Sequence, residues 1–166
     1  MDSDLFGQAY DVLFPAVYRY VRLRVPAEET EDVTAEIMAR IWKASGKFAG
    51  KSSLKTWALK IAANHVADYY RRRKQVTTVP LNEQPALIAG GPGLDDSVPE
   101  ALLLGSVFAR LPENQVAVME FRLIEGLSAR ETAEVMGATP QAVDSLLYRA
   151  KQNFRRAWEQ ETASVL

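Results

Sequence analysis

The chain has 166 residues, of which 48% are hydrophobic and 25% charged, and its formal net charge is -1. This is ordinary globular composition, which excludes collagen-like, disordered and coiled-coil classes. Cysteine is absent and His65 is the single histidine, which excludes disulfide frameworks, thiolate chemistry and multi-histidine metal centres. Because the acidic N-terminus leads into no apolar core and no apolar run approaches the ~20 residues that span a bilayer, we expect a cytoplasmic protein.

The near-neutral total conceals an uneven charge distribution. Residues 1–74 have 13 Lys and Arg against 9 Asp and Glu, residues 75–108 have 4 acids and no base, and residues 109–166 have 7 bases against 8 acids. Within the first block, residues 43–74 hold nine bases and one acid. A charge cluster acts locally, so this segment predicts contact with a polyanion in spite of the net charge.

Three helices are predicted in the first half from apolar residues at helical spacing. They cover about 5–25, 30–46 and 52–74, with Thr30 as N-cap of the second and Gly46 as its stop. The third ends in four consecutive bases, which the helix dipole favours at a C-terminus.

Proline and glycine then interrupt the helical pattern. Residues 75–97 contain Pro80, Pro85 and Pro92, a Gly-rich run at 89–93, and acids without bases. This composition predicts a flexible acidic linker between a domain at 1–74 and a domain at 98–166. The alternative is a single domain with one long surface loop, which would be unusual.

Helix start and stop signals punctuate the second half. Helices are predicted over about 99–110 and 112–125, with Pro112 as the first residue of the latter. Ser128 and Glu131 form a capping box for a short helix that ends at Gly137, and Thr139 caps a long final helix. With no strand-like alternation, the predicted fold class is all-α, with two small helical domains: a three-helix domain, then a helix-turn-helix domain.

Residues 128–151 have the layout of a helix-turn-helix, whose second helix enters the major groove of DNA. The pattern fits a plain αα-hairpin equally well. The face opposite the apolar stripe carries Gln141, Asp144, Ser145, Tyr148, Arg149 and Lys151. Gln141, Ser145 and Arg149 can donate to phosphates or bases. Asp144 would oppose a phosphate backbone and Leu146 offers only apolar contact, so this helix is expected to bind DNA weakly or to prefer unusual nucleobases.

The basic segment 43–74 also interleaves lysines and arginines with aromatic residues. Bases neutralise phosphates, and flat rings stack on exposed nucleobases, so nucleic-acid binding is the favoured interpretation of the basic excess. For Trp57 a core role is favoured, because it shares a face with Leu54 and Ile61. His65 is interpreted as a surface or packing residue without a partner.

Several stretches resemble the extracytoplasmic-function sigma factors, the compact members of the bacterial sigma-70 family. Residues 30–33, 36–42, 48–57, 61–64 and 68–73 resemble region 2, and the second half resembles region 4. The region 4 stretches are Leu111-Pro-Glu-Asn-Gln115, Glu125-Gly-Leu-Ser128, Glu134-Val-Met-Gly137 and Leu147-Tyr-Arg-Ala-Lys151. The resemblance covers nearly the whole chain in the order region 2, linker, region 4.

The resemblance implies an all-α, non-enzymatic transcription initiation factor without cofactor or metal. Its partners would be core RNA polymerase (β′ clamp helices and β flap), promoter DNA and an anti-sigma factor, with no membrane insertion. The acidic linker would thread through nucleic-acid channels of the polymerase. A sigma-like interaction protein that titrates an anti-sigma factor is the alternative function.

The resemblance also implies site residues. Region 2 would melt and hold the promoter −10 element through Phe48, Lys51, Ser52, Ser53, Thr56, Trp57, Lys60, Asn64, Arg71 and Arg72. Region 4 would recognise the −35 element through Arg130, Thr139, Gln141, Ser145, Tyr148, Arg149 and Lys151. Polymerase would be bound by Glu31, Asp32, Glu36, Met38 and Arg40. At the positions of Asp144 and Leu146, members of the family typically have basic residues.

Overall fold

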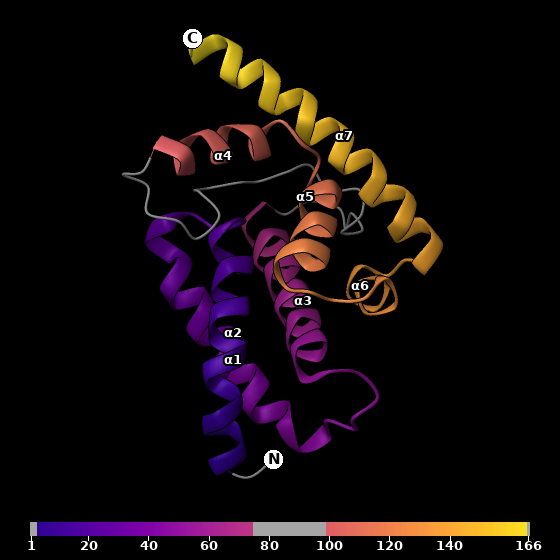
Figure 1. Cartoon of the computed structure of the whole chain (residues 1–166). Helices are drawn as coiled ribbons and strands as arrows, with labels where there is room; N and C mark the ends of the chain where they lie inside the picture. The colour runs from indigo at the N-terminus through magenta and orange to yellow at the C-terminus, as the bar shows by residue number, and fades with distance from the viewer. Residues whose placement is uncertain (1–2, 75–98, 166) are drawn as a thin grey trace.

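The computed structural model describes residues 3–74 and 99–165, and within these ranges every regular element is helical (Figure 1). The predicted all-α fold class is therefore confirmed for the described residues. The predicted linker at 75–97 lies outside them. None of the described helices is long and apolar enough to cross a membrane.

The first half is a bundle of three α-helices with short 3₁₀ turns between them. They are α1 (Ser3–Arg22), α2 (Thr30–Ala44) and α3 (Leu54–Lys74), and the turns are Ala27–Glu29 and Ser45–Lys47. Helix α1 packs against both α2 and α3. Its residues Leu13, Val17 and Val21, spaced four apart, are fully buried, which is the pattern expected of an amphipathic helix.

Helix α2 begins at Thr30, as predicted, and α3 begins at Leu54, two residues after its predicted start, but the N-cap role predicted for Thr30 is wrong. Ser53 Oγ accepts a hydrogen bond from the Thr56 backbone N–H (3.1 Å) and caps α3. Thr30, in contrast, is the first residue of α2, and its hydroxyl donates to the Pro26 carbonyl (3.0 Å). The 3₁₀ turn at Ala27–Glu29 continues directly into α2, so this helix needs no side-chain N-cap.

The second half contains four α-helices and one π-helical turn. They are α4 (Pro99–Ala109), α5 (Glu113–Met119), the π-helical η4 (Glu120–Ile124), α6 (Ala129–Met136) and α7 (Pro140–Val165). Pro112 precedes the first helical residue of α5 instead of being it.

The predicted signals around α6 and α7 are confirmed. Ser128 and Glu131 form both hydrogen bonds of a capping box. Gly137 ends α6 with φ +67°, a conformation that favours glycine. Thr139 accepts a hydrogen bond from the Ala142 N–H and caps α7 (3.1 Å).

The two halves are in contact. Helix α3 packs against α6, and the Tyr20 ring of α1 stacks on the Phe121 ring of η4, with centroids 5.9 Å apart and planes 6° from parallel. Both rings are fully buried. The contact between the halves therefore has an apolar centre.

Candidate nucleic-acid interface

A loop at 48–53 leads from the end of α2 into α3. The Phe48 ring lies 5.1 Å from the Trp57 ring, and both rings are partly buried. Trp57 packs against the hydrophobic core, as expected. Lys51 and Ser53 are exposed on the loop and Ser52 is partly exposed. The aromatic pair thus supports a loop that presents polar and basic groups to solvent.

The solvent-facing side of α3 carries a stripe of polar and basic residues. Lys60, Asn64 and Arg71 are exposed and recur at intervals of four and seven, which places them on one face of the helix over about 16 Å. Arg72 is exposed next to Arg71. Asp68 lies 2.6 Å from the Arg71 guanidinium and 4.0 Å from the Arg40 guanidinium, so it orients the Arg71 side chain within this stripe.

The first turn of α3 is covered by the second half. Thr56 is 0% exposed, and its hydroxyl donates to Glu131 Oε2 of α6 (2.8 Å) while accepting from the Ser53 hydroxyl (2.7 Å). In this conformation Thr56 cannot contact DNA, contrary to the sequence-based assignment. The neighbouring hydrogen bonds also act on Glu131: the Ser128 backbone N–H first, then the Thr56 hydroxyl, lower the pKa of Glu131 to about 2.

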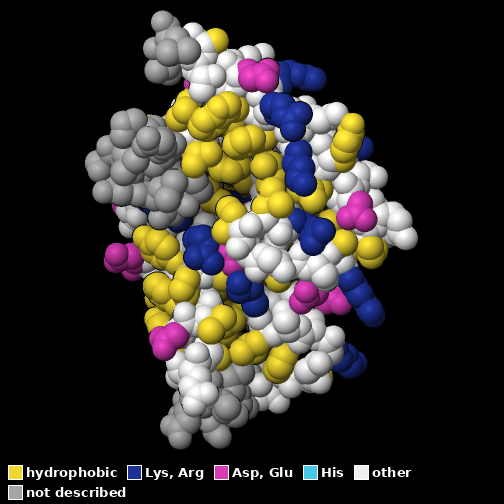
Figure 2. Space-filling model, in the orientation of Figure 1, with side chains coloured by type: hydrophobic (Ala, Val, Ile, Leu, Met, Phe, Trp, Pro, Cys, Tyr) yellow, Lys and Arg dark blue, Asp and Glu magenta, His cyan; other side chains and the backbone are white. Residues whose placement is uncertain are grey.

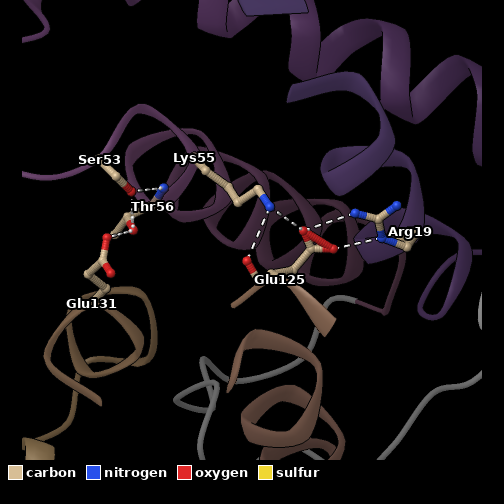
Figure 3. A network of polar contacts seen from close by, with 6 residues as sticks. All are labelled: Arg19, Ser53, Lys55, Thr56, Glu125 and Glu131. Carbon is tan, nitrogen blue, oxygen red and sulfur yellow. Dashed lines mark hydrogen bonds and ion pairs between the residues drawn. The ribbon is translucent and has the colours of Figure 1, made fainter. Parts of the chain in front are cut away.

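Glu125 binds two basic side chains of the first half (Figure 3). The Arg19 guanidinium donates to both of its carboxylate oxygens (2.7 and 3.1 Å). Lys55 Nζ lies 3.4 Å from Glu125 Oε2 and donates to the Glu125 carbonyl oxygen (3.1 Å). A single carboxylate thus connects α1 and α3 to the segment between η4 and α6.

A buried charge cluster lies deeper in the same contact. Arg24 Nε donates to Glu113 Oε1 (2.5 Å), and Arg24 Nη1 lies 2.8 Å from Glu120 Oε1 at ion-pair distance. All three residues are at most 3% exposed. The Arg24 guanidinium also lies over the Tyr20 ring, 3.7 Å from its centroid.

Burial shifts the protonation of this cluster. Desolvation, opposed by Arg24 and reinforced by Glu113, raises the pKa of Glu120 to about 7. Burial likewise raises the pKa of Glu113, against the attraction of Arg24. Burial would lower the pKa of Arg24, but the two carboxylates outweigh it and raise that pKa, so Arg24 stays charged. One cation thus faces two carboxyl groups, and Glu120 is the group that takes up a proton near neutral pH.

The helix-turn-helix presents its predicted DNA-facing residues to solvent. All seven are exposed: Arg130, Thr139, Gln141, Ser145, Tyr148, Arg149 and Lys151. Asp144 is exposed among them. Leu146 is not, because it is 8% exposed and belongs to the hydrophobic core. The interpretation of Leu146 as a contact on the DNA-facing side is therefore wrong.

Helix α2 presents an outer face with both signs of charge. Glu31, Asp32, Glu36 and Arg40 are exposed, whereas Met38 is 5% exposed and packs in the core, so its side chain is not available to a partner. His65 of α3 does have a partner, contrary to the sequence-based interpretation. Its Nε2 lies 2.9 Å from Glu36 Oε2 and connects α3 to this face of α2.

An apolar groove of about 550 Å³ runs between α4, η4 and α7. Its lining includes Leu104, Leu123, Phe154 and Trp158, with Lys151 and Arg155 of α7 contributing its basic groups. Figure 2 shows this hydrophobic area, with Lys and Arg side chains along its α7 side. The groove adds a second type of surface to the region around α7.

The charged residues of the contact between the halves were missed by sequence reasoning. Glu113 and Glu120 are seven residues apart on the side of α5 and η4 that also buries Val116 and Ala117. Charged residues at core-facing positions of an amphipathic helix are a signal of a buried ion pair. Arg24, the partner of both glutamates, lies just after the C-terminus of α1. A basic residue at that place is ordinarily explained by its favourable interaction with the helix dipole.

Two family comparisons cover most of the chain. Residues 9–76 match sigma-70 region 2, and residues 101–154 match sigma-70 region 4. The matches follow the order of the two helical halves. The chain therefore belongs to the sigma-70 family.

Individual relatives narrow the group to the extracytoplasmic-function (ECF) sigma factors. The ECF RNA polymerase sigma factor BldN of Streptomyces coelicolor is 36% identical over 164 residues, covering 93% of this chain and 61% of that protein. The ECF RNA polymerase sigma-E factor of Escherichia coli K12 is 29% identical over 139 residues, covering 77% of this chain and 73% of that protein. The chain thus spans less than two thirds of the length of BldN.

Solved structures share the fold. CnrH in complex with the cytosolic domain of CnrY superposes with a TM-score of 0.72 at 20% identity, over 96% of this chain and 90% of that one. The sigma factor RpoE in complex with the anti-sigma factor NepR from Bartonella quintana gives a TM-score of 0.72 at 18% identity, over 93% and 96%.

Proposed function

We propose that the chain is an alternative sigma factor that binds core RNA polymerase and directs transcription from specific promoters. The observation that carries the proposal is the joint presence of a region 2 surface on α3 and an exposed region 4 helix-turn-helix, in family order. The proposed domains are residues 1–74 and 98–166 with 75–97 as linker. The protein would act in the cytoplasm as a non-enzymatic factor.

The region 2 surface supports capture of melted DNA. Lys60, Arg71 and Arg72 can neutralise phosphates along α3, while Asn64 can hydrogen-bond to a base edge beside the Phe48–Trp57 loop. Binding an unstacked base offsets the few kcal/mol that its unpairing costs. The exposed positions 141, 145 and 149 of α7 would place region 4 on duplex DNA.

Two other surfaces support polymerase binding. The outer face of α2, with Glu31, Asp32, Glu36 and Arg40 exposed, is the proposed contact for the β′ clamp helices. The apolar groove beside α7 is the proposed contact for the β flap, and Lys151 and Arg155 are its basic groups. An anti-sigma factor is a further proposed partner. Of the two solved proteins that share this fold, RpoE is bound to the anti-sigma factor NepR, and CnrH is bound to the cytosolic domain of CnrY.

Reconstituted transcription tests this function. Core RNA polymerase is incubated with the chain and a genomic DNA library, and initiated transcripts are sequenced with and without the chain. We expect a discrete set of start sites that depends on the chain. Stable binding to an anti-sigma factor without any chain-dependent start site would favour the alternative, a titrating interaction protein.

A further inference from the structure

The start of α7 determines which of its side chains reach DNA first. Thr139 caps this helix, which spans Pro140–Val165. In a helix-turn-helix, the N-terminal residues of the second helix contact the nucleobase edges in the major groove. Gln141, Asp144 and Ser145 lie in the first two turns of α7 and are exposed. These three residues are therefore placed to read a DNA sequence.

The packing of α7 shows on which side of the helix Asp144 lies. Val143 and Leu147 are at most 9% exposed and belong to the core. Asp144 follows Gln141 by three residues and precedes Tyr148 by four, and all three are exposed. Side chains at these spacings share one face of a helix. Asp144 thus lies on the DNA-facing side of α7, between two other polar side chains.

The Asp144 carboxylate has no hydrogen bond or ion pair within the parts of the chain that the structure describes. By contrast, Asp68 of α3 pairs with Arg71 (2.6 Å), and Glu131 of α6 belongs to a capping box. The helix dipole favours acids in the first turn of a helix, but Asp144 is the fifth residue of α7 and lies beyond that turn. Because the helix gains little from this acid, its oxygens are available to a donor outside the chain.

The four nucleobases differ in what they offer to a carboxylate in the major groove. An ionised carboxylate accepts hydrogen bonds and donates none. Guanine presents the acceptors N7 and O6, thymine presents the acceptor O4 and a methyl group, and adenine presents the N6 donor beside the N7 acceptor. Cytosine presents the N4 amino donor alone. Cytosine is therefore the nucleobase whose major-groove edge suits a carboxylate best.

We propose that Asp144 is a specificity-determining residue that selects a cytosine in the −35 element by accepting a hydrogen bond from the cytosine N4 amino group. This inference rests on the proposed function, because it takes α7 to bind the −35 duplex. The same carboxylate repels the phosphates of every duplex, and only a cytosine at the facing position offsets that repulsion. Asp144 therefore discriminates mainly by weakening the binding of other sequences.

Basic residues around Asp144 supply affinity that does not depend on sequence. Arg130 of α6 and Arg149 and Lys151 of α7 are exposed near the start of the helix. Contacts of such residues to phosphates position a protein on DNA, whereas contacts to nucleobase edges specify the sequence. An acid among these basic residues lowers the total affinity, and it increases the difference between a site with the cytosine and a site without it.

Selection of DNA by the reconstituted polymerase tests the assignment. Core RNA polymerase with the full chain is incubated with one promoter taken from the chain-dependent start sites, in which the −35 segment has been randomised, and the bound duplexes are sequenced. Asp144→Asn keeps the shape of the side chain, but an asparagine amide pairs with N6 and N7 of adenine. Asp144→Ala removes the contact. Glu134→Gln, which removes an exposed acid of α6, is the control for the change in charge.

We expect the wild type and Glu134→Gln to enrich cytosine over the other nucleobases at one position of the −35 segment, by about five- to thirty-fold. Asp144→Asn should change the preference at that position from cytosine to adenine and leave the other positions as they were. Asp144→Ala should bind the unselected library more tightly and show no preference at that position. If Asp144 only repelled phosphates, all preferences would be the same in the wild type and in both Asp144 variants.

A −35 segment in which no cytosine preference depends on residue 144 would overturn the proposal. So would an Asp144→Asn chain that still selects cytosine. Transcription from the unaltered promoter separates these failures from that of the proposed function. Chain-dependent transcripts without the expected change in preference reject only the role of Asp144. The absence of any chain-dependent start site rejects the sigma factor assignment, and the present inference with it.

Discussion

Helices α3 and α7 are both proposed to bind DNA, yet they are presented in opposite ways. The first turn of α3 is buried against the second half, with Thr56 0% exposed, whereas Tyr148 on α7 is 65% exposed. The start of the more basic helix is thus covered, whereas the DNA-facing side of the other helix is exposed. The difference teaches that local charge identifies a nucleic-acid surface but does not say whether it is accessible, because acids from elsewhere in the chain can occupy it.

The largest expected effect comes from removing the buried cation that holds the halves together. Arg24→Ala leaves Glu113 and Glu120 facing each other, and breaking a buried pair in this way costs about 3 to 5 kcal/mol. Urea denaturation measures the loss. Arg24→Ala/Glu113→Gln should regain part of it, because one stranded charge is gone. A loss below that of Arg40→Ala, an exposed arginine of α2, would contradict the cluster's role.

The second effect is a pH dependence that acts on α3 and leaves α7 unchanged. Glu120 has a pKa of about 7 when buried against Arg24, Tyr20, Glu113 and Glu125, and an ordinary value of 4.5. The form in which the two halves are in contact therefore binds more protons, between these pH values, than a form in which they are separated. The contact is favoured as pH falls from 7 toward 4.5, by up to about tenfold per pH unit and about 3 kcal/mol in all.

Because the sequence has no cysteine, Val12→Cys in α1 and Gln152→Cys in α7, both exposed, can carry a donor and an acceptor dye. Energy transfer between these dyes, followed from pH 8 to pH 5, should rise when no other residue is changed. Glu120→Gln should flatten most of this rise, and the raised pKa of Glu113 accounts for a residual slope of the same sign. A rise toward alkaline pH would show that the buried carboxyl groups do not control the contact.

The third effect tests the part of α3 that stays exposed. Asn64→Ala should weaken promoter opening by about 1 to 3 kcal/mol, because a side-chain contact to a base edge is lost. Core polymerase binding should not change, since Asn64 belongs to α3 and the proposed polymerase contact is formed by residues of α2. Fluorescence of a base analogue in the −10 element measures opening, and Gln8→Ala, an exposed amide of α1, is the control. Equal losses in opening and in core binding would remove Asn64 from the DNA site.

The smallest effect belongs to α7. Asp144→Arg replaces an exposed acid on the DNA-facing side and should tighten binding to −35 duplex by about tenfold at low salt, with a steeper salt dependence. Leu146→Arg should instead destabilise the second half, because Leu146 is core. Unchanged duplex affinity in Asp144→Arg would mean that this side of α7 does not face the groove.

Much of the local structure could be predicted from local signals. The capping box of Ser128, the αL turn at Gly137 and the cap of α3 by Ser53 each involve residues within a few positions of one another, so the sequence is sufficient to locate them. Thr30 failed as an N-cap because a preceding 3₁₀ turn had already supplied the helix start. Leu146 and Met38 were assigned to binding surfaces from their positions in motifs, but both side chains pack in the core.

The candidate site was less predictable than the helices that carry it. Its exposed members on α3 and α7 follow from periodicity and charge. Lys55 and Glu125 are 70 positions apart in the sequence, and Thr56 and Glu131 are 75 positions apart. Because the partners are so distant, no local pattern predicts either contact. Arg24 was the hardest case, since a base just after α1 has a sufficient local explanation in the helix dipole.

The sequence by itself determined the all-α class, the order of the helices, the basic character of residues 43–74 and the family. These depend on periodicity, composition and short motifs, which are properties of neighbouring residues. Only the tertiary structure decided that acids of the second half cover the start of α3, and that one arginine is buried between two glutamates. Those features depend on which surfaces meet when the helices pack, where desolvation changes what a charge does.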